Sequence, residues 1–224
     1  MPELPEVETV VRGLSALLVG RRFTRVVARR PDLRLPLPAD LGQRLTGAEV
    51  IAVGRRAKFG RIDTDRGDTL LFHLGMSGRF RPAPAVAGRH DHVRFETGDA
   101  ALVYTDPRRF GFMDLAGTAD LPRHRFLAGL GPEPLDHGFT GAILAEAFAG
   151  RTAPAKALLL DQRIVAGIGN IYAAEALFAA RIDPRTPAGA LDRPALDRLV
   201  AALKQVLAEA IAAGGSSLRD HARP

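Results

Sequence analysis

After residue 20, the spacing of hydrophobic residues changes its period once along the chain, and this change restricts the possible folds most. Up to about residue 115, short apolar stretches alternate or cluster between turn-forming runs such as 65–68 and 98–99, which indicates strands joined by hairpins. After the Pro- and Gly-bearing run 130–135, apolar residues recur every three or four positions, which indicates helices. We therefore expect an α+β protein whose strands and helices lie in separate parts of the chain.

One helix is expected before the strands, because apolar residues at helical spacing run from Pro5 to Val19 and Gly20 can end the helix. The expected strands occupy residues 22–30, 48–55, 59–65, 68–74, 91–97, 101–106 and 110–115. Many short strands in succession favour a sandwich or a flattened barrel. The expected later helices occupy residues 140–149, 154–160, 170–180 and 193–213. The predicted division is a β domain with a leading helix at 1–118, a linker at 119–138 and an all-α domain at 139–224.

Composition excludes several kinds of site and favours one class of partner. The 224 residues include no Cys, so disulfides and thiolate metal sites are excluded. No apolar run approaches the ~20 residues of a membrane span, and no signal peptide is visible. The formal net charge of +6 suits a polyanionic partner.

The first residues carry the most distinctive chemistry. If Met1 is removed, the chain begins with Pro2, whose nitrogen is then a free secondary amine. An α-amino group titrates near pH ~7.7–8.0, so part of it is neutral and can attack C1′ of a sugar, expel the base and leave an iminium. Glu3 and Glu6 are close enough in sequence to move the protons that this chemistry requires.

A purely structural alternative explains the same residues. Pro5 suits the first position of a helix, and Glu6 and Glu8 favour the positive end of its dipole. Both interpretations can hold together, because a helix start would present Pro2 and Glu3 rigidly. Since neither Pro2 nor Glu3 belongs to a core stripe, we expect substitutions there to leave folding nearly unaffected.

Two further motifs stand out in the sequence. Lys58 follows two Arg residues and precedes a strand, and it is a compact point charge in a chain with few Lys residues. The run Ala166–Tyr172 is a Gly-rich turn that opens a helix, so it offers backbone N–H groups to a phosphate. Its spacing to Asn170 does not match a dinucleotide-binding fingerprint.

Two loops present residues of the types that enter a DNA duplex. In the run 73–78, two glycines flank Met76, which suggests a tight loop that projects an unbranched apolar side chain. In the run 104–111, Arg108 and Phe110 lie on a turn. Arg, Phe and Met at loop tips can wedge into a duplex and fill the space of an extruded base. The structural alternative for each loop is a hairpin with a buried hydrophobic residue.

Together these stretches resemble the bacterial formamidopyrimidine-DNA glycosylases. The matching segments keep the family's order over the whole chain, at residues 2–9, 55–58, 73–78, 90–92, 105–111, 130–135 and 158–178. The resemblance implies an N-terminal β-sandwich, a helix-two-turn-helix domain, and DNA held in the cleft between them. It also implies base-excision repair by a bifunctional glycosylase and AP lyase, which removes 8-oxoguanine and formamidopyrimidines through an N-terminal proline Schiff base and β,δ-elimination.

The resemblance implies roles for individual residues. Pro2 corresponds to the nucleophile, Glu3 to the acid that protonates the opened deoxyribose, and Glu6 to a second carboxylate near the active site. Lys58 corresponds to a catalytic-loop lysine that contacts phosphate. The implied DNA-contacting residues are His73, Met76, His90, Arg108, Arg109, Phe110 and Asn170, of which Met76, Arg108 and Phe110 form the group that fills the void.

In the family, the chain continues into a lesion-recognition loop and a zinc finger with four Cys, which this sequence does not contain. We therefore expect no zinc finger, metal or cofactor. From the resemblance we also expect a monomer in the bacterial cytoplasm, which binds duplex DNA with oxidised purines or abasic sites at the nucleoid. If Met1 is retained, the Pro2 nitrogen is a tertiary amide and cannot act as a nucleophile. The alternative function is that of a catalytically impaired, finger-less DNA-binding remnant or shortened form of the enzyme.

Overall fold

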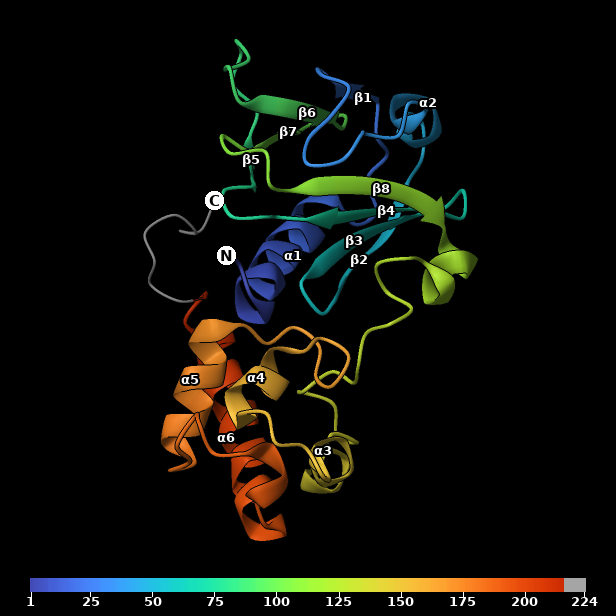
Figure 1. Cartoon of the computed structure of the whole chain (residues 1–224). Coiled ribbons are helices and arrows are strands. Elements are labelled where there is room, and N and C mark those ends of the chain that lie inside the picture. Colours follow the sequence, from blue (N-terminus) through green and yellow to red (C-terminus); the bar gives the residue numbers. More distant parts are fainter. Residues whose placement is uncertain (216–224) are drawn as a thin grey trace.

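The computed structural model describes residues 1–215, and within them a β-sandwich precedes a group of packed helices (Figure 1). The run 216–224, which we placed at the end of the helical domain, lies outside the described residues. None of the helices in the described part of the chain is long and apolar enough to cross a membrane.

Two antiparallel four-stranded sheets form the sandwich. The strand order in one sheet is β2 (Val50–Arg56), β3 (Phe59–Thr64), β4 (Asp68–His73) and β8 (Phe112–Gly117). The order in the other is β1 (Arg25–Ala28), β6 (Asp91–Glu96), β7 (Ala101–Thr105) and β5 (Arg79–Pro82). The two sheets confirm the expected sandwich and rule out the flattened barrel.

Strand β5 and helix α2 are among the elements that the sequence pattern does not reveal. Strand β5 contains Pro82 and pairs with β7 at the edge of its sheet, where a missing backbone donor is tolerated. Helix α2 (Leu41–Leu45) is too short to show a period, although both of its terminal leucines are buried. Each element is defined by tertiary packing more than by local preference.

Helix α1 (Leu4–Leu18) joins the sandwich to the helical domain. Its apolar residues recur at three- and four-residue spacing and therefore share one face, which is buried in the sandwich core. The helix also contacts α6 (Arg193–Ala212) of the second domain. Gly20 adopts a φ of +78° just beyond the helix, a left-handed conformation that glycine adopts readily, and this confirms the expected stop.

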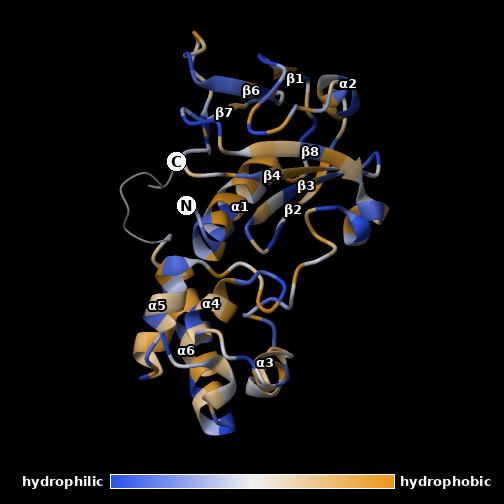
Figure 2. Cartoon of the chain, viewed as in Figure 1, coloured by the Kyte–Doolittle hydropathy of each residue, from blue (hydrophilic) through white to orange (hydrophobic). Residues whose placement is uncertain are grey.

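Within the described residues, four α-helices build the second domain: α3 (Gly141–Phe148), α4 (Ala155–Leu160), α5 (Asn170–Ala179) and α6 (Arg193–Ala212). Helices α4 and α5 flank the turns at 161–169 and form the expected helix-two-turn-helix. Figure 2 shows hydrophobic residues on α4 and α6, and these contribute to one core cluster. The Asp192 carboxylate caps α6 by accepting from the Ala195 N–H.

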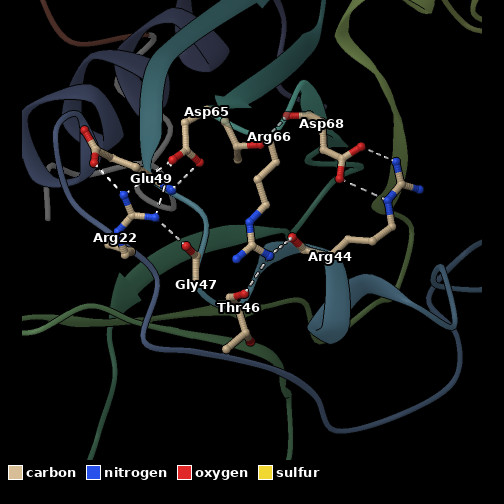
Figure 3. A network of polar contacts seen from close by, with 9 residues as sticks. Arg22, Arg44, Thr46, Gly47, Glu49, Asp65, Arg66 and Asp68 are labelled. Atoms are coloured by element: carbon tan, nitrogen blue, oxygen red, sulfur yellow. Dashed lines mark hydrogen bonds and ion pairs between the residues drawn. The ribbon is translucent and has the colours of Figure 1, made fainter.

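A network of Arg and acidic side chains ties together the turns at one end of the sandwich (Figure 3). Arg22 pairs with Glu49 and Asp65, and Arg44 pairs with Asp68. These pairs are partly exposed, so each contributes little to stability. The network shares no residue with the pocket described below, and we interpret it as structural.

Glu133 fastens the linker to the turn between β2 and β3. Its Oε1 accepts from Arg56 Nη1 at 2.8 Å and from the Ala57 N–H at 2.6 Å, and its Oε2 forms an ion pair with Arg55 Nη1 at 2.7 Å. Arg56 also donates to the carbonyls of residues 130 and 131. Burial opposes the charge of Glu133, but Arg55, the Ala57 N–H and Arg56 together lower its pKa.

Replacing Glu133 by Ala should therefore destabilise the protein by about 3 kcal/mol, because it leaves two arginines without their shared carboxylate. Urea denaturation of the variant and the wild type measures this difference. The matched control is Glu146→Ala, at an exposed position of α3, which should change the free energy of unfolding by less than about 0.5 kcal/mol. Equal midpoints for both variants would contradict the structural role of Glu133.

Candidate active site

A pocket of about 310 Å³ lies beside the start of the chain, between the two domains. Figure 1 places the N-terminus at this junction. The lining residues come from both domains: Met1, Glu3, Lys58, Leu160, Ile168, Gly169, Asn170 and Ile171. Pro2 is buried next to the pocket, and Met1 is 57% exposed. The pocket thus brings together three residues that the sequence singled out, Glu3, Lys58 and Asn170.

The Glu3 carboxylate binds the start of helix α5. Oε2 accepts from the N–H of Gly169 at 2.8 Å and of Tyr172 at 3.4 Å, and Oε1 accepts from the N–H of Ile171 at 3.0 Å. A Cβ on Gly169 would overlap with the carboxylate. The negative charge therefore lies at the positive end of the α5 dipole, on three N–H groups that have no acceptor within the helix.

Two expectations from the sequence are wrong at this point. The N–H groups at the start of α5 were expected to face a phosphate, but those of Gly169, Ile171 and Tyr172 donate to Glu3. Glu3 was also expected to matter little for folding, yet it is 3% exposed and links the two domains. Sequence patterns fail here because the cap joins residues that are far apart in the chain.

Glu6 is equally well connected. Its Oε2 accepts from the Glu3 N–H at 2.8 Å, and its Oε1 accepts from the Tyr172 hydroxyl at 2.6 Å. The side chain therefore holds the backbone at the start of α1 against α5. The sequence did not single out Tyr172, although it lies within the Gly-rich run that opens α5.

Lys58 lies on the turn between β2 and β3 and is 8% exposed. The preceding residue, Ala57, has a φ of +52°, and Glu133 and Arg55 bind its N–H and carbonyl. Burial lowers the pKa of Lys58, while the charges of Glu3 and Glu6 oppose this shift. A lysine with a lowered pKa beside a carboxylate in a pocket is a typical candidate for a functional residue.

His73 ends strand β4 with an uncharged ring. Its Nδ1 accepts from the Gly75 N–H at 3.0 Å, and its ring stacks on Phe112 with centroids 5.4 Å apart. Burial, followed by the charges of Lys58 and Arg34, lowers the pKa of His73 to about 4. At neutral pH the ring therefore carries its proton on Nε2, which can donate to a phosphate.

The remaining predicted DNA contacts gather on loops at one end of the sandwich. Met76 is 41% exposed and Phe110 is 44% exposed, so neither is the buried hydrophobic residue of the structural alternative. The Arg108 guanidinium lies 4.7 Å from the centroid of the Phe110 ring. Arg109 is exposed with a φ of +56°. His90 is half-buried, and its carbonyl accepts from the Asp106 N–H.

Replacing His73 by Asn should reduce the decrease in the free energy of unfolding that occurs as the pH falls below neutral. The pKa of His73 is lower in the folded state, so the unfolded chain binds the extra proton between pH 6.5 and about 4. Stability is therefore lost as the pH falls through that window, by about 3 kcal/mol at 1.36 kcal/mol per pKa unit. Asn keeps an acceptor for Gly75 but does not titrate. Urea denaturation at pH 7 and pH 4.5 measures the difference, and parallel losses in both proteins would contradict the buried neutral ring.

Two family models match the chain. The formamidopyrimidine-DNA glycosylase N-terminal domain matches residues 1–113, and the family's H2TH domain matches residues 130–222. The formamidopyrimidine-DNA glycosylase of Rhizorhabdus wittichii is 59% identical over 225 residues, which cover 100% of this chain and 83% of that protein. The Erythrobacter litoralis protein of the same name is 54% identical, with the same coverage.

Solved structures agree with the sequence relatives. The Lactococcus lactis formamidopyrimidine-DNA glycosylase, bound non-covalently to DNA with an AP site, aligns with a TM-score of 0.88 at 34% identity, over 96% of this chain and 83% of that one. The Thermus thermophilus protein aligns with a TM-score of 0.87 at 40% identity, over 98% and 80%. Both domains, their order and their arrangement match, and this chain belongs to the formamidopyrimidine-DNA glycosylase family.

Proposed function

We propose that this DNA glycosylase of base-excision repair removes 8-oxoguanine and formamidopyrimidines from duplex DNA and then cleaves the strand as an AP lyase. The observation that carries the proposal is the pocket at the chain start, where Glu3 and Lys58 meet Asn170 of the second domain beside the buried Pro2. Related structures contain an AP site or a Fapy-dG lesion in their DNA. The alternative of an impaired DNA-binding remnant is not favoured, because the residues proposed for catalysis are retained.

The proposed reaction begins after removal of Met1, which frees the Pro2 nitrogen. This nitrogen forms a bond to C1′ of the nucleotide, and the base departs with the electrons of the glycosidic bond. The Glu3 carboxylate takes the proton that the amine loses on bonding to C1′ and gives it to the sugar ring oxygen as the ring opens, so that the nitrogen lone pair forms an iminium with C1′. Loss of a proton from C2′ expels the 3′ phosphate, and a second elimination expels the 5′ phosphate.

The other residues have supporting roles in this proposal. Glu6 holds the backbone of Glu3 and the hydroxyl of Tyr172, so it positions the N-terminus. Lys58, and the neutral His73 as an N–H donor, contact the phosphates around the extruded nucleotide, with Asn170 on the opposite wall. His90 and Arg109 contact the backbone nearby, and Met76, Arg108 and Phe110 fill the space that the base leaves.

The residues of this chain do not fit the zinc ion that four Cys hold in the family's finger, because the sequence contains no Cys. Within residues 1–215, no group of three His, Asp or Glu side chains is arranged to hold a metal ion. The proposed chemistry uses an amine and carboxylates alone and needs no cofactor. We propose that the enzyme acts on chromosomal DNA in the bacterial cytoplasm, as a monomer.

Borohydride trapping on abasic duplex tests the nucleophile. Met-processed wild-type protein should become covalently linked to the DNA, and Pro2→Gly should trap poorly. Glu3→Gln should abolish excision of 8-oxoguanine, lowering the rate by about 100-fold or more, which is the contribution of a positioned acid. Because Glu3 is buried, thermal denaturation must first show that the variant is folded. Full excision by folded Glu3→Gln would remove the assignment.

The salt dependence of binding tests Lys58. Each phosphate neutralised contributes about −0.9 to the slope of log K against log salt, so Lys58→Met should weaken binding and make the slope shallower by about 0.9. Lesion and undamaged duplex should respond alike. The matched control is Lys204→Met, because Lys204 binds the Asp136 carbonyl and does not line the pocket. A loss confined to lesion DNA would show that Lys58 reads the base instead.

A further inference from the structure

The three residues proposed to enter the duplex lie on two separate loops. Met76 lies on the loop that leads from β4 to β5, and Arg108 and Phe110 lie on the loop that leads from β7 to β8. Each loop passes from one sheet of the sandwich to the other, and β4 pairs with β8 while β5 pairs with β7. The two loops therefore lie side by side at one edge of the sandwich.

Asp106, the first residue of the loop between β7 and β8, connects the two loops. It is fully buried, at 0% exposure. Its Oδ1 accepts from the Ser77 hydroxyl at 2.5 Å, and its Oδ2 accepts from the Gly111 N–H at 2.8 Å. The Ser77 oxygen in turn accepts from the Arg108 N–H at 3.1 Å. One carboxylate thus binds the residue after Met76 and the residue after Phe110.

Backbone packing leaves these loops little freedom. A Cβ on Gly75 would overlap with the backbone at residues 110 and 111. A Cβ on either Gly78 or Gly111 would overlap with the hydroxyl of Tyr104. Burial and the neighbouring Asp106 raise the pKa of Tyr104 well above its usual value, so its hydroxyl stays protonated. The loops are interlocked before any DNA is bound.

We propose that Asp106, acting through Ser77, is a positioning residue that joins the two loops into one rigid wedge, so that Met76, Arg108 and Phe110 enter the duplex together. This inference rests on the proposed function. A preformed wedge avoids the entropic cost of ordering each loop separately when the stack opens. The benefit concerns base extrusion only, since an abasic site has no base to extrude.

Single-turnover assays on two substrates test the wedge. Ser77→Ala removes the hydroxyl that links Asp106 to Arg108, with little change in volume. It should slow excision of 8-oxoguanine roughly tenfold, the effect of losing one hydrogen bond to a charged group. Strand cleavage at a preformed abasic site should stay within about twofold. Ser77→Thr keeps the hydroxyl and should restore excision, and Ser15→Ala on α1 is the matched control.

A fluorescent 2-aminopurine beside the lesion reports opening of the stack directly. The rise in 2-aminopurine fluorescence should be slower with Ser77→Ala and with Asp106→Ala than with the wild type. In a chain where Met76, Arg108 and Phe110 are all Ala, adding Ser77→Ala should cause no further loss of excision rate. The link between Asp106 and Ser77 would then have no wedge residues left to position.

The outcomes separate this inference from the function on which it rests. If the triple-Ala chain excises 8-oxoguanine normally, the proposed role of the three residues is wrong. If that chain is impaired but Ser77→Ala matches the wild type, the role of the three wedge residues is correct and the positioning role of Asp106 and Ser77 is wrong. If Ser77→Ala slows cleavage of abasic DNA as much as excision, Ser77 does not act on base extrusion specifically. The proposed positioning role of Asp106 and Ser77 is then also wrong.

Discussion

The bond between the Glu3 carboxylate and the start of helix α5 is the interaction on which the rest of this structure depends. It brings the first acidic residue of the chain to N–H groups more than 160 positions away, at Gly169, Ile171 and Tyr172. A carboxylate at a helix N-terminus satisfies donors that the helix itself leaves unpaired. Because α1 is buried in the sandwich and its first turn is bound to α5, the two domains meet at the chain's N-terminus. The pocket therefore exists only where both domains are in place.

A second layer of contacts supports the same junction. Glu6 binds the Glu3 backbone and the Tyr172 hydroxyl, and Glu133 of the linker holds the turn that presents Lys58. Two carboxylates that do not line the pocket, those of Glu6 and Glu133, thus support residues that do. Groups held in this way lose little conformational freedom when a substrate binds, which is the physical basis of preorganised catalysis.

Local signals were sufficient to predict most of the elements. The stripes that form α1 and α6 and the glycines that end them were visible because period and stop residue lie within one stretch of chain. Strand β5 was missed because Pro82 masks an edge strand. The site was predicted only in part: Glu3, Lys58 and Met76 stand out by type and neighbours. The role of Tyr172 depends on a contact with Glu6 across 166 positions. The role of Asp106 depends on hydrogen bonds from Ser77 and Gly111 that form only in the folded protein. No periodicity encodes such pairs.

Amide hydrogen exchange at the start of α5 tests the central claim most directly. The N–H groups of Gly169, Ile171 and Tyr172 should exchange slowly in the wild-type protein, because each donates to Glu3. In Glu3→Ala they should exchange at least about tenfold faster, as expected for the loss of roughly 1.4 kcal/mol of local protection. The amide of Leu144 in α3 should be unchanged. Unaltered protection of all three amides in Glu3→Ala would contradict the account, since Glu3 would then not hold the two domains together.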